Sequence, residues 1–152
     1  MKLAEALSIR KDLQKRIEQL KSRLENTVKV QEGEQPAENP EDLLKELDGC
    51  LNQLETMLYR INATNMQTVA DGKTLTMLLA EREVLTMRTQ TLRSVFERAS
   101  ASQERYSRSE IKMVTTVDVK KLRAQVDRLS SELRQKDVYI QRLNFTTDLV
   151  EC

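Results

Sequence analysis

Residues 39–65 read NPEDLLKELDGCLNQLETMLYRINATN, and this stretch decides the fold. Asn39 followed by Pro40 is typical of a helix start, because asparagine caps free backbone amides and proline favours the first turn. Leucine or isoleucine then recurs three and four residues apart, at Leu44, Leu47, Leu51, Leu54, Leu58 and Ile61. The repeat places an apolar stripe along one helix, and Leu43, Cys50 and Met57 widen that stripe. This width favours a helical bundle over an isolated two-stranded coil.

Three further stretches carry a similar repeat, so we expect four helices, at about residues 2–28, 40–65, 74–100 and 118–144. Aromatic residues make up only 3% of the 152 residues, and there are three glycines and two prolines, which disfavours β-sandwiches and barrels. Similar helix lengths, roughly 40 Å each at 1.5 Å per residue, favour packing side by side. We therefore predict an all-α chain, with residues 1–152 forming a single domain that is an antiparallel four-helix bundle.

The two long connections of this bundle would lie at the same end. Residues 28–31 alternate apolar and polar side chains, and so do residues 111–117, as in half-buried strands. We expect these two segments to pair as a small two-stranded β cap. Asp71-Gly72 indicates a separate turn between the second and third helices.

Composition also bounds the cellular setting. The net charge is +1, so bulk charge favours neither nucleic acid nor an anionic membrane as a partner. Cys50 and Cys152 have no spacing typical of a disulfide framework or a metal site. No run approaches the roughly 20 apolar residues of a membrane span. We expect a soluble, cytoplasmic protein without a transmembrane segment.

Three cations interrupt the apolar stripes, namely Arg10, Arg82 and Lys136. The predicted topology places all three at one level of the bundle. Each side chain could reach water and pair with nearby acids, such as Asp12, Glu83 and Asp137. The level could instead be a polar layer that fixes helix register. A third interpretation is an internal anion pocket with Glu55 and Glu81 as acidic members.

A second candidate site is the basic stretch around Tyr106. Its residues are Arg105, Tyr106, Arg108, Glu110 and Lys112. Cations next to a tyrosine can contact phosphates and stack a base, as in proteins that bind single-stranded nucleic acid. The alternative is a solvated loop whose arginines pair with Glu32 and Glu34 of the other long connection.

Catalytic groups are sparse in this sequence. Histidine is absent, which removes the commonest general base and every histidine-dependent metal site. Gly33, Gly49 and Gly72 are isolated, so no glycine-rich phosphate loop is present. The apolar stripes carry no acid that could build a carboxylate metal site. We predict a protein that is not an enzyme, with no catalytic residues, no metal and no cofactor.

Four stretches carry a family resemblance. They are residues 30–34 (VQEGE), 60–65 (RINATN), 79–83 (LAERE) and 105–112 (RYSRSEIK). In this order and spacing they resemble the septicolysin-like family of small bacterial proteins, over nearly the whole chain. The resemblance implies no site residues, and the family name implies a membrane-active cytolysin.

Three hypotheses of function follow. The first is a non-catalytic helical scaffold or interaction protein that self-associates as a homo-oligomer, because Leu43, Cys50, Met57 and Leu79 extend the apolar surface beyond one seam. The second is an anion or single-stranded nucleic-acid binder that uses the loop at residues 105–112, although the chain's neutral charge does not favour nucleic acid. The third is the membrane-active cytolysin.

Overall fold

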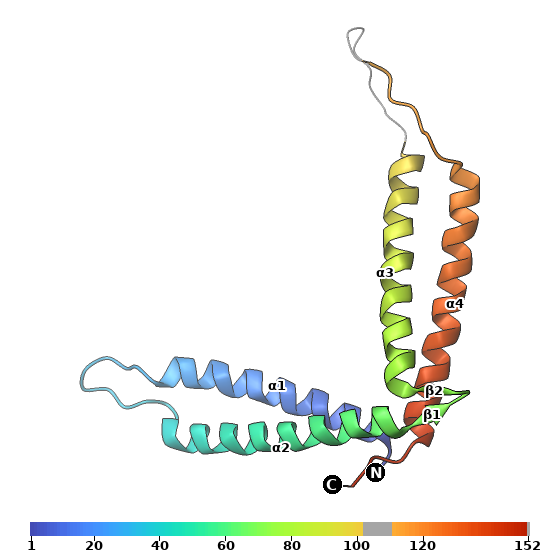
Figure 1. Ribbon diagram of the computed structural model, residues 1–152. Helices are drawn as coiled ribbons and strands as arrows, with labels where there is room; N and C mark the ends of the chain where they lie inside the picture. The colour runs from blue at the N-terminus through green and yellow to red at the C-terminus, as the bar shows by residue number, and fades with distance from the viewer. Residues whose placement is uncertain (102–110, 152) are drawn as a thin grey trace. The chain divides into compact units, whose positions relative to one another are not determined.

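The computed structural model describes residues 1–101 and 111–151 of the chain (Figure 1). Its helices within these ranges are α1 (Leu3–Thr27), α2 (Pro40–Gln67), α3 (Leu75–Ser100) and α4 (Val119–Thr146). A two-stranded antiparallel sheet of β1 (Val69–Ala70) and β2 (Lys73–Thr74) joins α2 to α3. The predicted fold class, all-α with four long helices and a small two-stranded β element, is confirmed. Each helix boundary lies within about two residues of the position predicted from the apolar repeat.

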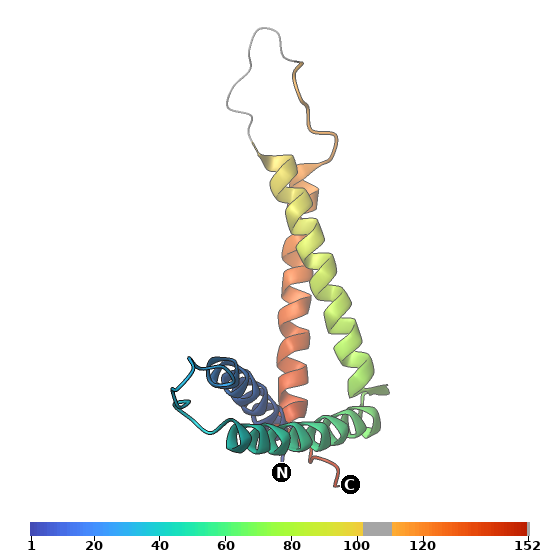
Figure 2. The ribbon, with the colours of Figure 1, turned by 90° about the vertical axis from the view of Figure 1, so that its left-hand side faces the viewer.

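Contacts divide the chain into two compact units, which are described separately. Unit 1 comprises residues 1–75 and 142–152, and unit 2 comprises residues 76–141. Within unit 1, α1 and α2 run side by side in opposite directions, as both Figure 1 and Figure 2 show. Within unit 2, α3 and the facing part of α4 also run antiparallel. The single domain over residues 1–152 stays a prediction.

The start of α2 has the local structure that its sequence predicts. Asn39 is extended, and its Oδ1 accepts a hydrogen bond of 3.0 Å from the backbone amide of Glu41. Pro40 occupies the first turn, where its missing amide hydrogen leaves no bond unmade. Glu41 and Asp42 place negative charge at the positive end of the helix. These features fix where α2 begins.

The core of unit 1 lies between α1 and α2. Leu13, Leu20 and Leu24 of α1 are buried with Leu43 and Cys50 of α2. Ile9, Ile17, Leu47 and Leu54 pack against this cluster and are partly buried. Burying these side chains contributes roughly 1.5–3 kcal/mol for each fully buried leucine, so the contact holds the hairpin together.

The segment after α4 is fastened to the start of α1. The amide of Leu3 donates to the carbonyl of Thr147 at 2.9 Å, and the amide of Leu149 donates to the carbonyl of Met1 at 2.8 Å. Lys2 and Asp148 lie between them as an isolated antiparallel β-bridge, and their side chains form an ion pair of 2.8 Å. We call residues 1–3 together with residues 147–150 the terminal clasp. Its hydrogen bonds place the two ends of unit 1 beside each other.

The β element forms at a different place from the one predicted. Val69 pairs with Thr74 and Ala70 with Lys73, whereas residues 28–31 and 111–117 contain no strand. Both turn residues have positive φ, 50° at Asp71 and 78° at Gly72. An Asp-Gly turn of this kind closes a two-residue hairpin at small entropic cost, because the strands are adjacent in sequence. The predicted cap needed two segments far apart in the sequence, and the prediction of that cap is wrong.

Candidate functional site

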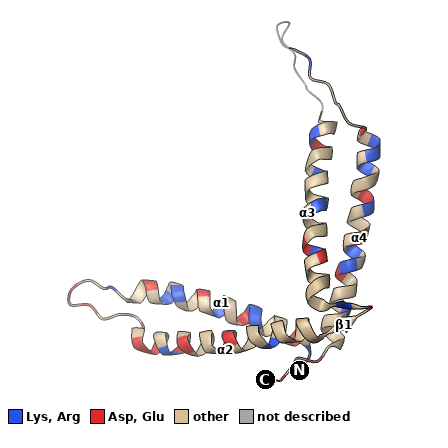
Figure 3. Ribbon diagram, viewed as in Figure 1, with Lys and Arg blue, Asp and Glu red and all other residues tan. Residues whose placement is uncertain are grey.

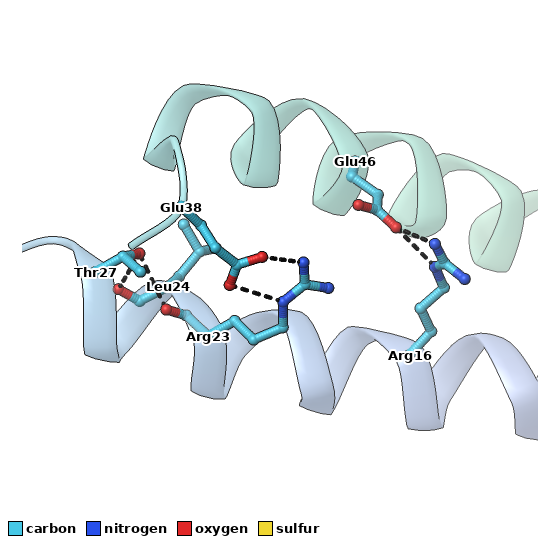
Figure 4. Close-up of polar contacts among 6 residues, drawn as sticks. All are labelled: Arg16, Arg23, Leu24, Thr27, Glu38 and Glu46. Carbon is cyan, nitrogen blue, oxygen red and sulfur yellow. Dashed lines mark hydrogen bonds and ion pairs between the residues drawn. The ribbon is translucent and has the colours of Figure 1, made fainter. Parts of the chain in front are cut away.

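One flank of the α1–α2 hairpin is polar and is held by two arginine–glutamate pairs (Figure 4). Arg16 Nε donates to Glu46 Oε1 at 2.9 Å, and Arg23 Nε donates to Glu38 Oε2 at 3.1 Å. In both pairs the NH2 group of the arginine makes a further, shorter contact with the same carboxylate. Arg16 and Arg23 are seven residues apart, two helical turns, so they lie on the same side of α1. We call this side the polar flank.

The two pairs shift the pKa values of Glu38, Arg23 and Arg16. The hydrogen bond from Arg23 lowers the pKa of Glu38, and it raises the pKa of Arg23 in turn. The hydrogen bond to Glu46 likewise raises the pKa of Arg16. Because these groups are exposed to solvent, each pair contributes little to stability, and the positions of the pairs mark the register of α1 against α2.

The opposite flank of the hairpin exposes leucine side chains. Leu44 is 49% exposed and Leu51 is 43% exposed. Leu44 precedes Glu46 by two residues, which places the two side chains about 200° apart around α2. Partly buried Ile17, Leu47 and Leu54 connect Leu44 and Leu51 to the core. We call these five residues the leucine flank.

This arrangement corrects the expectation about which side chains widen the apolar surface. Leu43 and Cys50, predicted to extend it outwards, are buried against α1, with 4% and 7% exposure. Leu44 and Leu51, predicted to line the seam, are the exposed ones. Both sets repeat every seven residues, so the apolar repeat alone does not fix the rotation of α2 about its axis.

Arg10 adjoins the leucine flank. It lies seven residues before Ile17 on α1, so it shares the side of the helix on which Ile17 lies. Its side chain is partly buried, and its fully buried Nε has no hydrogen-bond partner in the part of the chain that the structure describes. No ion pair of Arg10 is found within residues 1–101 and 111–151. Such a group is costly to leave without an acceptor.

An acidic row borders the leucine flank on α2, where Figure 3 shows acidic positions in red. Glu41, Asp48 and Glu55 are exposed and follow each other at intervals of seven residues. Each lies three or four residues from Leu44 or Leu51, which makes them neighbours on the helix surface. Sequence reasoning missed this row, although the seven-residue spacing of the three acids was a signal for it.

In unit 2, two of the three cations that interrupt the apolar stripes form ion pairs with carboxylates between α3 and α4. Lys136 Nζ donates to Glu81 Oε2 at 2.6 Å. Arg82 NH1 lies 3.7 Å from Asp137 Oδ1. Each of these cations therefore has a carboxylate on the other helix, and Asp137 was among the acids considered for this role. Arg10 belongs to unit 1, so a common level for all three cations stays a prediction.

Most residues of the basic stretch around Tyr106, the second predicted site, are outside the part of the chain that the structure describes. Arg105, Tyr106, Arg108 and Glu110 lie outside the described residues. Lys112, Glu32 and Glu34 are exposed, and none of them forms an ion pair within the described part of the chain. Pairing between Glu32 or Glu34 and the arginines of the basic loop stays a prediction.

Two features are absent from the described residues. They contain no group of three or more His, Cys, Asp or Glu side chains that could hold a metal ion. No described helix combines the length and the apolar character that crossing a membrane requires.

Comparison with known proteins places the chain in a family. The model of DUF6847, a family of unknown function, matches residues 10–149. The chain belongs to the DUF6847 family. It is also similar to a crystal structure of a functionally unknown conserved protein from Corynebacterium diphtheriae, with 42% sequence identity and a TM-score of 0.93. That match covers 99% of each chain, whereas no curated protein matches.

Membership in DUF6847 corrects the resemblance drawn from four short stretches. The match to the septicolysin-like family is wrong, because neither the family model nor the related crystal structure points to it. The cytolysin hypothesis rested on that family name and loses its basis.

Proposed function

We propose that this DUF6847 protein is a non-catalytic interaction protein that self-associates through the leucine flank. The observation that carries the proposal is the exposure of Leu44 and Leu51 on a helix whose other leucines are buried or partly buried. A contact that covered the two leucines would gain a hydrophobic free energy of about 25 cal/mol for each Å² of apolar surface buried.

A helix of a second copy fits this surface. Leu44 and Leu51 lie two turns apart on one line, and leucines at this spacing insert between side chains of a facing helix at a shallow crossing angle. The α1–α2 hairpin of a second copy presents a surface of this kind. Self-association would therefore bury the same leucines on both copies, as in a two-fold symmetric interface.

We also propose a cytoplasmic location. Cys50 is a free thiol in the core of unit 1. A buried free cysteine is compatible with a compartment in which thiols stay reduced.

Analytical ultracentrifugation over a range of concentrations tests the self-association. We expect the wild-type protein to show a mass that rises from one copy to two with concentration. The double variant Leu44→Lys/Leu51→Lys should remain a single copy, with an unchanged helical signal in circular dichroism. Met87→Lys is the matched control, because Met87 is 59% exposed but lies on α3 in unit 2.

Two results would contradict the proposal. One is a wild-type protein that stays a single copy at every concentration. The other is a double variant that associates as strongly as the wild type, which would show that the leucine flank is not the contact.

A further inference from the structure

The α1–α2 hairpin supplies no hydrogen-bond acceptor to Arg10 Nε. Its Nε is buried without a partner among the described residues, and Arg10 borders the leucine flank, on which Leu44 and Leu51 are exposed. A ligand that covers Leu44 and Leu51 would remove further water from around Arg10. Binding is then favourable only if the covering surface brings a carboxylate or a comparable acceptor.

The register of the hairpin fixes the height of Arg10. Arg16 pairs with Glu46, so Arg10, six residues earlier on α1, is level with about position 52 on the antiparallel α2. Asp48 and Glu55 lie within about four residues of that level, or roughly 6 Å along the axis at 1.5 Å per residue. Within its own hairpin, Arg10 pairs with neither of them.

Two arrangements can place the leucine flanks of two copies against each other. In the first, the two-fold axis runs parallel to the helices, so that α1 of one copy packs on α2 of the other at the same height. In the second, the axis is perpendicular to the helices, so that α2 packs on α2. The second arrangement sets two acidic rows of Glu41, Asp48 and Glu55 against each other, which is repulsive.

We infer that two copies associate in the first arrangement, in which Arg10 of each copy pairs with Asp48 or Glu55 of the other. This inference rests on the proposed self-association and specifies its geometry. The four helices of the two hairpins then form an antiparallel bundle, with the leucine flanks inside. Each interface contains two such arginine–carboxylate contacts, because the symmetry repeats the contact.

The first test removes the charges without large changes in side-chain size. We expect Arg10→Met to raise the dissociation constant of the dimer at least about tenfold, the scale of one lost charge pair. The unfolding midpoint of the single copy should be unchanged or higher, since a buried unpartnered nitrogen is removed. The double variant Asp48→Asn/Glu55→Gln should also weaken the dimer. If α2 packed on α2, this double variant would tighten it, and Arg10→Met would have little effect.

The second test reverses the charges. Arg10→Glu in one chain and Asp48→Arg/Glu55→Arg in another should each give a weakly associating protein. A mixture of the two should form a heterodimer about as tight as the wild-type dimer, because both contacts are then complementary. Lys15→Glu is the matched control, since Lys15 is an exposed cation of α1 that faces away from the leucine flank by its helical spacing.

The outcomes separate this inference from the proposed function. A wild-type protein that never associates overturns both. A dimer that Leu44→Lys/Leu51→Lys abolishes, but that Arg10→Met leaves unchanged, overturns only the arrangement inferred here. Weak association of Arg10→Glu without recovery in the mixture also overturns the arrangement.

Discussion

The backbone amide of Val150 donates a hydrogen bond of 3.0 Å to the hydroxyl of Thr64, which lies 86 residues earlier in the chain. The same hydroxyl donates to the carbonyl of Arg60 at 2.7 Å. Arg60 Nε in turn donates to the carbonyl of Val150 at 2.9 Å. Thr64 is only 1% exposed, so water cannot replace these bonds. The segment after α4 is therefore attached to α2 as well as to the start of α1.

Removing the hydroxyl of Thr64 should destabilise the protein. Thr64→Val keeps the volume but leaves the partly buried amide of Val150 without the hydroxyl acceptor, which costs about 1–3 kcal/mol of unfolding free energy. Urea denaturation followed by circular dichroism measures the change. Thr56→Val is the control, because exposed Thr56 makes the same kind of bond to the carbonyl of Asn52 and nothing else depends on it. Equal losses in both variants would show that the bond to Val150 contributes nothing.

Two glycines should respond in opposite directions to alanine. Gly72 has a φ of 78°, in the left-handed region, so Gly72→Ala should cost about 1–2 kcal/mol. Gly49 lies inside α2, and a Cβ there would meet nothing within 4 Å. Gly49→Ala should therefore stabilise the protein by about 0.5–1 kcal/mol, because the unfolded chain loses freedom. Thermal and urea unfolding of the two variants checks the signs, and a stabilised Gly72→Ala would contradict the assigned turn.

The ion pair between Lys136 and Glu81 should couple the two helices of unit 2. Its side chains are 23% and 34% exposed, which limits its contribution to about 1 kcal/mol. Lys136→Met should lower the unfolding free energy, whereas the double variant Lys136→Met/Glu81→Gln should lose less than the two single changes combined. A double-mutant cycle in urea measures this coupling. A coupling energy of zero would mean that the contact is incidental to stability.

Acidification should weaken the polar flank. Arg23 lowers the pKa of Glu38 below its ordinary value of 4.5, so the folded state holds the charged carboxylate more strongly than the unfolded state does. The stability that this pair contributes is complete above pH 4.5 and is lost as the pH falls through the lowered pKa of the folded state. We expect Glu38→Gln to be less stable than the wild type at pH 7 and to approach it at pH 3.

The control for the acid response is Glu34→Gln, because Glu34 is exposed and forms no ion pair among the described residues. Urea unfolding at both pH values gives the comparison. A difference between wild type and Glu38→Gln that stays constant with pH would contradict the sign assigned to Glu38. The ion pair of Lys2 with Asp148 lowers the pKa of Asp148, so Asp148→Asn should show the same trend.

The helices could be predicted because their signals are local. Asn39 and Pro40 mark the start of α2 without reference to any other part of the chain, and the spacing of apolar residues gives the extent of each helix. The turn at Asp71-Gly72 was recognised for the same reason. The strands beside it were not, because two residues are too few to show an alternating pattern.

The parts that depend on distant residues could not be predicted in this way. Leu43 and Leu44 are both apolar and adjacent, and only the pairing of Arg16 with Glu46 shows which of them faces α1. Residues 147–150 have no periodic pattern, so nothing local indicates that Leu149 is buried or that it binds the backbone of Met1. The unpartnered Nε of Arg10 is likewise visible only when its surroundings are known.

The terminal clasp has a consequence for the order of events on the ribosome. Residues 1–3 are synthesised before α1, yet their hydrogen-bond partners at residues 147–150 are made only after α4. The hairpin of α1 and α2 can assemble early from nearby contacts, but the hydrogen bonds at the start of α1 wait for residues 147–150. We therefore expect the clasp to close only after residues 147–150 have been synthesised, and chains truncated before Thr147 to fray at Leu3.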